Sequence, residues 1–343
     1  MRRRLQWLLA VAALGLPAPS SAAEPRPLFA DDGVLQLEIR GPIAQVSRAE
    51  EPAPATLTLK GAVPETHAIR LSPRGITRRR RETCSFPPLR VEFSAKPAAT
   101  SLFRGQKRLK LVTHCRAPVR FQQYILLEYA AYRLFNLVTP SSFRVRLAQI
   151  DYVGLDGELQ TSRAGFFIED IDDAARRNGA KEARVGDRVP ASQLSPADAA
   201  SFAVFQYMIG NLDWSMNRGP EGRGCCHNSR LISPTGTAGP YVPVPDDFDF
   251  SGLVDAPYAV PPDSIDLPNV RVRLYRGYCG HNSKALAAIG AFRSKRAEFH
   301  STLAGVSGLD GASRRKAAAY LDGFFEEVAS EERVSRLLKP CIR

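Results

Sequence analysis

The chain has 343 residues, of which 44% are hydrophobic and 24% charged, enough for the core of one large domain or two small ones. This composition excludes an intrinsically disordered chain. The formal net charge of +12 favours anionic partners such as nucleotides, phosphorylated glycans or membrane surfaces.

The N-terminus has the features of a cleavable export signal. Three arginines at positions 2–4 precede an apolar run over 5–16, and small residues follow up to Ala23. The run is shorter than the ~20 apolar residues of a membrane-spanning helix, and no later stretch qualifies. We therefore predict a signal peptide over 1–23 and an exported protein, periplasmic or secreted, with no transmembrane segment.

In the first half of the chain we predict strands followed by a helix. Short β-branched or apolar runs bounded by proline, glycine and charge predict strands over 34–40, 55–60, 68–72, 89–93 and 109–114. A helix is expected over 121–138, before Pro140, with strands over 143–153 and 165–169 after it.

The second half is mainly helical and carries the acidic motifs. Ser195 is placed to cap a helix through 201–209, which leads to Asn211 and Asp213. A hairpin is expected from 229–232 and 241–244, ending at Asp246 and Asp247. Apolar residues at helical spacing then predict helices over 285–303 and 313–327.

Glu128 falls within the apolar face of the predicted helix 121–138, in a stripe with Phe121, Ile125, Tyr132 and Phe135. A buried carboxylate needs a partner or a raised pKa. Lys110, in the preceding strand, is the natural partner, and Lys107 is less central. Such a pair would hold a lysine against nucleotide phosphates. The alternative is that Glu128 only reaches the rim of the helix.

The order of the acidic residues is typical of phosphoryl transfer. Asp213, just past a helix end, could orient a hydroxyl nucleophile, while Asp247 and Asp249, after a later strand, could hold Mg²⁺ on the phosphates. The alternative is a solvated acidic turn. Phe248 and Phe250 alternate with the aspartates and favour a partly buried segment.

Positive charge peaks at the four consecutive arginines 78–81. The run could bind polyanions or form a solvated loop. No aromatic residues are interleaved with it as in single-strand binding platforms, so we do not expect nucleic acid as a partner.

Six cysteines follow the signal segment: Cys84, Cys115, Cys225, Cys226, Cys279 and Cys341. An even number in an exported chain predicts disulfides. Neither Cys-Cys-His at 225–227 nor Cys-Gly-His at 279–281 has the spacing of a structural zinc site. We expect Cys84 and Cys115 to form one pair.

Three further short motifs complete the pattern: Arg-Leu-Ser-Pro-Arg-Gly-Ile-Thr at 70–77, Leu-Glu-Tyr at 127–129 and Gly-Phe-Phe-Ile-Glu-Asp-Ile-Asp at 165–172. With Asp213 and the segment 247–252, they make the chain resemble the CotH kinase family of spore-coat protein H-like proteins, from about 69 to 252. That family looks like a distant, atypical relative of protein and lipid kinases.

The resemblance implies an α+β, protein-kinase-like two-lobed fold with an N-terminal antiparallel sheet plus helix and a mainly helical C-terminal lobe. We accordingly divide the chain into N-terminal strands and linker over 24–66, an N-lobe-like sheet with helix 121–138 over 67–173, and a C-lobe-like region over 174–343. The last contains the site loops 211–228 and 245–252 and the C-terminal helices.

Site residues are also implied by the resemblance. Asp213 resembles the catalytic aspartate, and Asp247 or Asp249 resembles the metal-binding aspartate in an Asp-x-Asp-x-Ser-Gly setting. Glu169 resembles the acidic end of the segment that passes the adenine, and Arg74 belongs to the nucleotide-facing arginine-glycine motif.

Two departures from the family pattern concern the ligands of the metal and the phosphates. The second metal ligand is either Asn217, by its distance from Asp213, or Asn228, by its position before a strand. Arg90 stands where the family often has a lysine, so the cation on the phosphates is open.

The sequence therefore predicts an exported kinase-like protein that transfers phosphate from ATP or another nucleotide, with Mg²⁺, to a protein or other hydroxyl acceptor. G-x-S-x-G, H-E-x-x-H and Gly-Lys motifs are absent from the sequence, which argues against the usual serine hydrolases, zinc proteases and phosphate-loop enzymes. A glycosidase using two of the acids stays open. The competing hypothesis is a catalytically silent envelope protein that keeps a kinase-like fold for binding.

Overall fold

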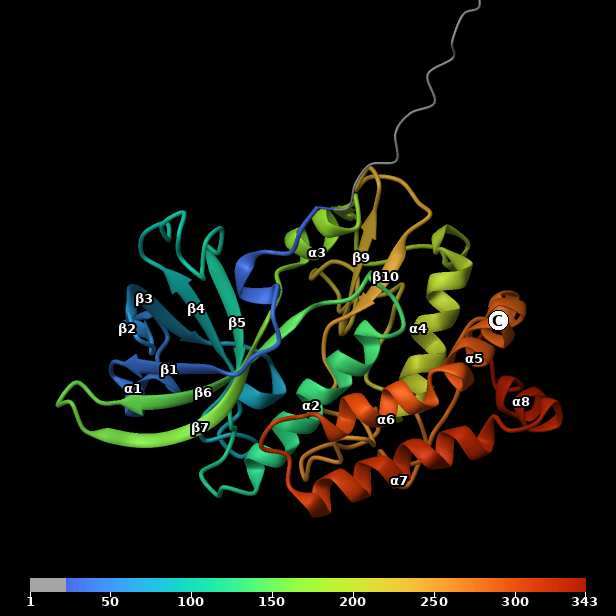
Figure 1. Ribbon diagram of the computed structural model, residues 1–343. Coiled ribbons are helices and arrows are strands. Elements are labelled where there is room, and N and C mark those ends of the chain that lie inside the picture. The colour runs from blue at the N-terminus through green and yellow to red at the C-terminus, as the bar shows by residue number, and fades with distance from the viewer. Residues whose placement is uncertain (1–22) are drawn as a thin grey trace, which may run out of the picture.

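The computed structural model describes residues 23–343, so the predicted signal peptide, Ala23 apart, lies outside the described residues. Within that range the chain forms a β-barrel followed by a mainly helical region with a small second sheet (Figure 1). No helix there is both long and apolar enough to cross a bilayer.

Seven strands form the barrel: β1 (Leu35–Arg40), β2 (Ala53–Leu59), β3 (Glu65–Pro73), β4 (Leu89–Phe93), β5 (Arg108–Val112), β6 (Val145–Val153) and β7 (Leu159–Ile168). Their order around the barrel is β1-β2-β3-β4-β5-β7-β6. The sheet differs from the predicted antiparallel one, because β1 also pairs in parallel with β6 and closes it. As a result β1 and β2 belong to the same sheet as the strands after residue 67.

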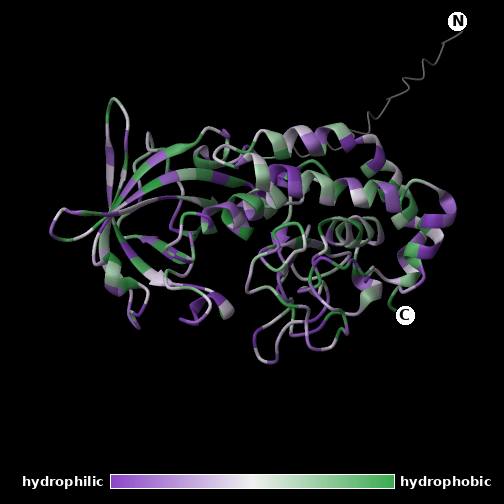
Figure 2. Ribbon diagram, turned by 90° about the horizontal axis from the view of Figure 1, so that it is seen from below, coloured by the Kyte–Doolittle hydropathy of each residue, from purple (hydrophilic) through white to green (hydrophobic). Residues whose placement is uncertain are grey.

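Alternating side chains fill the barrel interior. On β1, Leu35, Leu37 and Ile39 are buried while their neighbours are exposed or half-buried, as the two-residue period of a strand requires. The same alternation of hydrophobic and hydrophilic residues is visible along the barrel strands in Figure 2. Gly165 allows β7 to approach β5, since a Cβ at this position would lie 2.7 Å from the carbonyl oxygen of Val112.

The helices are α1 (Ile43–Val46), α2 (Phe121–Asn136), α3 (Ile171–Arg177), α4 (Pro196–Ile209), α5 (Asn282–Ser294), α6 (Arg296–Ala304), α7 (Gly311–Glu327) and α8 (Glu331–Leu338). The second sheet has the order β10-β9-β8, with β8 (Lys181–Glu182), β9 (Ser229–Ser233) and β10 (Val242–Pro245). The single helix predicted over 285–303 is two helices, α5 and α6, which meet at Lys295.

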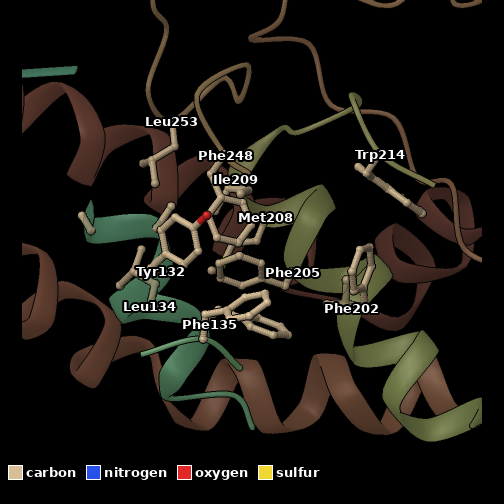
Figure 3. Close-up of a cluster of buried hydrophobic side chains, with 14 of the residues drawn as sticks. Tyr132, Leu134, Phe135, Phe202, Phe205, Met208, Ile209, Trp214, Phe248 and Leu253 are labelled. Atoms are coloured by element: carbon tan, nitrogen blue, oxygen red, sulfur yellow. The ribbon is translucent and has the colours of Figure 1, made fainter. Parts of the chain in front are cut away.

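An aromatic core joins α2, α4 and the loop after β10 (Figure 3). Phe248 is fully buried and packs edge-on against Tyr132 of α2, with ring centroids 4.6 Å apart, and against Phe205 of α4 at 5.7 Å. Because burying a phenylalanine stabilises a fold by roughly 1.5–3 kcal/mol, this ring fixes the position of the two aspartates that flank it.

The end of α4 fixes the start of the other acidic motif. Gly210 has φ +64°, and a Cβ there would lie 2.0 Å from the Tyr320 hydroxyl oxygen, so only glycine fits. The chain turns sharply at this residue and leads directly into Asn211 and Asp213.

The six cysteines form three pairs at disulfide distance. Cys84 pairs with Cys115, as predicted, and the others are Cys225 with Cys226 and Cys279 with Cys341. The first pair ties the loop before β4 to the connection between β5 and α2. That loop begins with the arginine-glycine motif.

Candidate functional site

Asp213 lies in the loop after α4, and its carboxylate is held from two sides. His227 donates through Nε2 to Oδ1 of Asp213 at 2.6 Å, and Asn228 donates through Nδ2 to Oδ2 at 2.9 Å and to the backbone oxygen at 2.8 Å. The side chain of Asp213 is 28% exposed, so the oriented carboxylate still reaches solvent. The hydrogen bond to Asp213 raises the pKa of His227.

Asn211 connects the two acidic motifs. Its amide nitrogen donates to the backbone oxygen of Asp247 at 3.2 Å, and its Oδ1 accepts from the backbone nitrogen of Asp213 at 3.1 Å. Trp214 donates to the backbone oxygen of the same asparagine at 2.8 Å. The loop after α4 and the segment after β10 are therefore bound to each other and meet in one place.

Arg78, the first residue of the basic run at 78–81, is the central cation where the two acidic motifs meet. It is buried, whereas Arg79, Arg80 and Arg81 are exposed. Its guanidinium contacts Glu128 at 2.8 and 3.2 Å, Asp247 at 3.0 Å and Asp249 at 3.1 Å. One side chain thus joins the loop after β3, helix α2 and the segment after β10.

The predicted ion pair between Lys110 and Glu128 was wrong. Glu128 is buried, with 1% exposure, as one reading of the helix face predicted, but Arg78 is its partner. Lys110 instead contacts both carboxylate oxygens of Asp246, at 2.8 and 2.5 Å. The stripe on α2 correctly indicated a buried acid, but a buried position alone does not specify which cation reaches it.

Negative charge exceeds positive charge around Arg78. Burial lowers the pKa of Arg78, but Asp249, Glu128 and Asp247 together raise it well above the ordinary value. Burial also raises the pKa of Asp249 well above its usual range and that of Glu128 to about 7. For Asp247, the attraction of Arg78 and Arg74 outweighs burial and lowers the pKa. A further cation beside Asp247 and Asp249 would therefore be attracted by this cluster.

A cavity of about 430 Å³ opens beside this cluster. It is lined by residues of the arginine-glycine loop and of both acidic motifs, together with a proline-rich segment near 260, and they include Arg74, Arg78, Asp213, His227, Asn228, Asp246, Asp247 and Asp249. Most of the predicted site residues therefore face one cleft. The cleft lies between the loop after β3 and the loops that follow α4 and β10.

Four predicted site residues do not line the cleft. Lys110 and Glu128 adjoin it through Asp246 and Arg78, and the other two lie apart from it. Glu169 is fully buried, and Arg177 of α3 contacts both of its carboxylate oxygens, at 3.1 and 2.9 Å, in an ion pair that does not line the cleft. Asn217 accepts from the Ser215 hydroxyl at 3.3 Å and does not line the cleft either. Asn228 is therefore the asparagine that adjoins Asp213.

The oxygen ligands near Arg78 suit a hard cation. Within 23–343, no group of three or more His, Cys, Asp or Glu residues is arranged to hold a metal ion by itself. Mg²⁺ commonly uses one or two carboxylates and completes its octahedron with substrate phosphates and water. Asp247 and Asp249 could supply these one or two carboxylates, and Asp247 faces the cleft.

Three side chains of the site were missed from the sequence: Arg78, Asp246 and His227. The arginine run hid Arg78, because nothing in four consecutive arginines indicates which one points inward. Asp246 was missed because nothing in the sequence distinguishes it from the neighbouring aspartates Asp247 and Asp249. For His227 the only signal was its place directly before Asn228, and adjacency to Cys226 favoured a structural role.

Comparisons with known proteins add little to this geometry. No model of a protein family matches the chain, and no curated protein matches it. Among solved structures, the crystal structure of CtkA, a proinflammatory kinase of Helicobacter pylori, is similar over 73% of this chain and 92% of that chain, with 10% identity and a TM-score of 0.41. A similarity of this size defines neither the fold nor the function.

Proposed function

We propose that this chain is an exported, kinase-like phosphotransferase that moves a phosphoryl group from ATP or another nucleotide to a protein or other hydroxyl acceptor. The observation that carries the proposal is the convergence of Asp213, Asp247 and the Arg78–Glu128 pair on one cleft. These groups supply an orienting carboxylate, a metal-binding carboxylate and a fixed cation, the parts that phosphoryl transfer needs. The three cysteine pairs support an oxidising compartment.

Asp213 is proposed to accept a hydrogen bond from the acceptor hydroxyl and to take its proton as the new P–O bond forms. The bond from the γ-phosphorus to the bridging oxygen breaks in the same step, and the nucleoside diphosphate leaves with that oxygen. His227 and Asn228 occupy one oxygen each, which fixes the plane of the carboxylate. A carboxylate held this way needs no reorganisation when the hydroxyl arrives, and correct positioning supplies much of the rate enhancement.

The phosphates are proposed to lie against Arg74, Arg78 and Lys110. Arg74 and Arg78 line the cleft, and Glu128 holds Arg78 in place as an acidic residue on a helix holds the phosphate-binding lysine of protein kinases. Lys110, on β5, is near enough to Arg74 for that arginine to lower its pKa, with burial as the larger cause. Arginine suits this role because its planar fork binds phosphate oxygens in pairs.

Asp247 and Asp249 are proposed to hold Mg²⁺, with Asn228 as the neighbouring amide. The ion would neutralise charge on the nucleotide phosphates. Burial, with Asp247 and Glu128 nearby, raises the pKa of Asp249 even though Arg78 lowers it. Added positive charge would favour the ionised carboxylate.

One observation favours the second candidate, a binding protein without catalysis. Arg78 contacts both Asp247 and Asp249, and Asp246 holds Lys110, so the groups that would bind nucleotide and metal bind each other. A chain that keeps these contacts in the presence of nucleotide would be a silent relative.

The experiment is a transfer assay with the exported chain, Mg²⁺ and ATP labelled on the γ-phosphate, using autophosphorylation and a mixed protein acceptor as readouts. We expect transfer by the wild type, its loss in Asp213→Asn with nucleotide binding retained, and loss of metal-dependent binding in Asp247→Asn. Asp263→Asn is the matched control, since Asp263 is an exposed residue at the rim of the same cleft. Full activity in both site variants would refute the assignment, and nucleotide binding without transfer would favour the silent relative.

A further inference from the structure

A second feature lies beside the cleft: a strongly basic surface that we call the arginine face. Arg79, Arg80, Arg81 and Arg120 are exposed and Arg116 and Arg163 are half-buried. In the described part of the chain, none of these six side chains has a carboxylate within 4.0 Å. Arg78, next to them, instead forms ion pairs with the buried Glu128 and Asp249 and the half-buried Asp247.

The arginine face is preformed by contacts between two loops. The Cys84–Cys115 pair joins them, and Arg116 donates to the backbone oxygen of Thr83 at 2.7 Å. Arg163 of β7 donates to the backbone oxygen of Ala117 at 3.0 Å. The two loops and the guanidinium groups of Arg116 and Arg163 are therefore held in place before a ligand binds, which lowers the entropy that binding costs.

Local electrostatics leave this surface short of negative charge. Helix α2 begins directly behind Arg120, no side chain caps it, and its first turn contains no acid. The helix dipole adds positive potential to that of the arginines. Glu82 is the single acidic residue in the sequence between 74 and 91.

The arginine face continues into the cleft. The loop that lines the cleft with Arg74 to Arg78 passes directly into Arg79, Arg80 and Arg81. A chain bound on these arginines would therefore extend to the cleft that contains Asp213. The cleft itself is rich in carboxylates, which repel an acidic ligand, so an acidic chain would be held at the arginines with only its hydroxyl residue at the cleft.

We propose that the arginine face docks an acidic segment of the polypeptide acceptor and presents an adjacent serine, threonine or tyrosine to Asp213. This inference rests on the proposed function and names its substrate class. Arginines pair with carboxylates in bidentate geometry, so several acidic side chains of one peptide could pair with arginines of this face. Bound in this way, the peptide holds its hydroxyl residue by contacts remote from the reacting atoms.

The test measures binding of a short fluorescein-labelled, glutamate-rich peptide with one serine, by anisotropy, without nucleotide. We expect Arg79→Gln/Arg80→Gln/Arg81→Gln to bind about tenfold more weakly, roughly a factor of two for each surface charge removed. Arg120→Gln, on the other side of the disulfide, is expected to lose about twofold. Wild-type binding is expected to weaken with added salt, because exposed charges are screened.

The matched control removes three exposed charges from α5 and the end of α8: Lys284→Gln/Arg293→Gln/Lys339→Gln. It changes the net charge equally and should bind within about twofold of the wild type, since these charges lie outside the docking loop and are screened. Equal losses in both triple variants would overturn the inference by showing a general charge effect. Absence of wild-type binding, or binding to phosphatidylglycerol vesicles in place of the peptide, would overturn it too.

Failure of the inference and failure of the proposed function are separable. Asp213→Asn should bind the glutamate-rich peptide as the wild type does, because the docking surface does not include the carboxylate of Asp213. Peptide binding without phosphate transfer to its serine would count against the proposed function alone. Equal transfer to acidic and neutral peptides by both wild type and the arginine triple variant would count against the docking surface alone.

Discussion

Arg78→Met is the substitution that tests the charge arrangement of the cleft most sharply. Methionine keeps much of the length and apolar volume of the side chain but removes the guanidinium. Arg78 is buried and contacts Glu128, Asp247 and Asp249. The variant therefore leaves three carboxylates without their shared cation.

We expect the free energy of unfolding to fall by about 3–5 kcal/mol at neutral pH, the usual cost of removing one partner of a buried ion pair. The loss should shrink as pH falls toward 5. Burial raises the pKa of Glu128 to about 7 and that of Asp249 above its usual range. Without Arg78 these carboxyls take up protons more readily and escape the penalty of a buried charge.

The assay is urea unfolding at pH 5 and pH 8, extrapolated linearly to water. Arg79→Met is the matched control, because Arg79 is the next residue and is exposed. It should change stability by less than about 0.5 kcal/mol, as surface substitutions usually do. Equal stability of the two variants, or an Arg78→Met loss that grows at low pH, would refute the reasoning.

Three further outcomes follow from the same structure. Burial raises the pKa of Glu128 from 4.5 to about 7, so the stability that this carboxyl contributes is present below pH 4.5 and lost as pH rises through 7. In unfolding curves, Glu128→Gln should therefore remove a change of about 3 kcal/mol in the free energy of unfolding across that pH range. Cys84→Ser/Cys115→Ser opens a loop with a sequence separation of 31 and should cost about 3–4 kcal/mol of unfolding free energy, and an unchanged melting temperature would argue against the pair. Glu169→Gln leaves Arg177 without its buried partner, so calorimetry should show a loss of stability with the Kd of nucleotide unchanged. A higher Kd in this variant would instead indicate that Glu169 takes part in nucleotide binding.

Local pattern predicted most elements of the fold but not how they join. Each barrel strand was recognisable from a short β-branched or apolar run bounded by proline, glycine or charge, although β7 begins at Leu159, before the predicted 165–169. Closure of the barrel was not, because β1 pairs with β6 more than a hundred residues later, and neither strand encodes its partner. The break at Lys295 was missed for a related reason: α5 and α6 continue one helical pattern of apolar residues across it.

The candidate site shows the same limit. The sequence placed Asp213 and Asp247 in order, and Gly210 and Phe248 explain why both reach one cleft. The ion-pair partner of Glu128 could not be predicted from the sequence, because the burial of an acid does not indicate which of several cations reaches it. Geometry, rather than spacing from Asp213, placed Asn228 at the aspartate.

The most direct test of the account is calorimetric titration of the protein with ATP, with and without Mg²⁺. We predict Mg²⁺-dependent binding that is lost in both Asp247→Asn and Arg78→Met and retained in Asp263→Asn, with a matching rise in unfolding free energy of about 2.7 kcal/mol at a hundredfold excess over Kd. Absence of binding to any nucleoside triphosphate, with or without the metal, would contradict the proposal that this cleft is a nucleotide site.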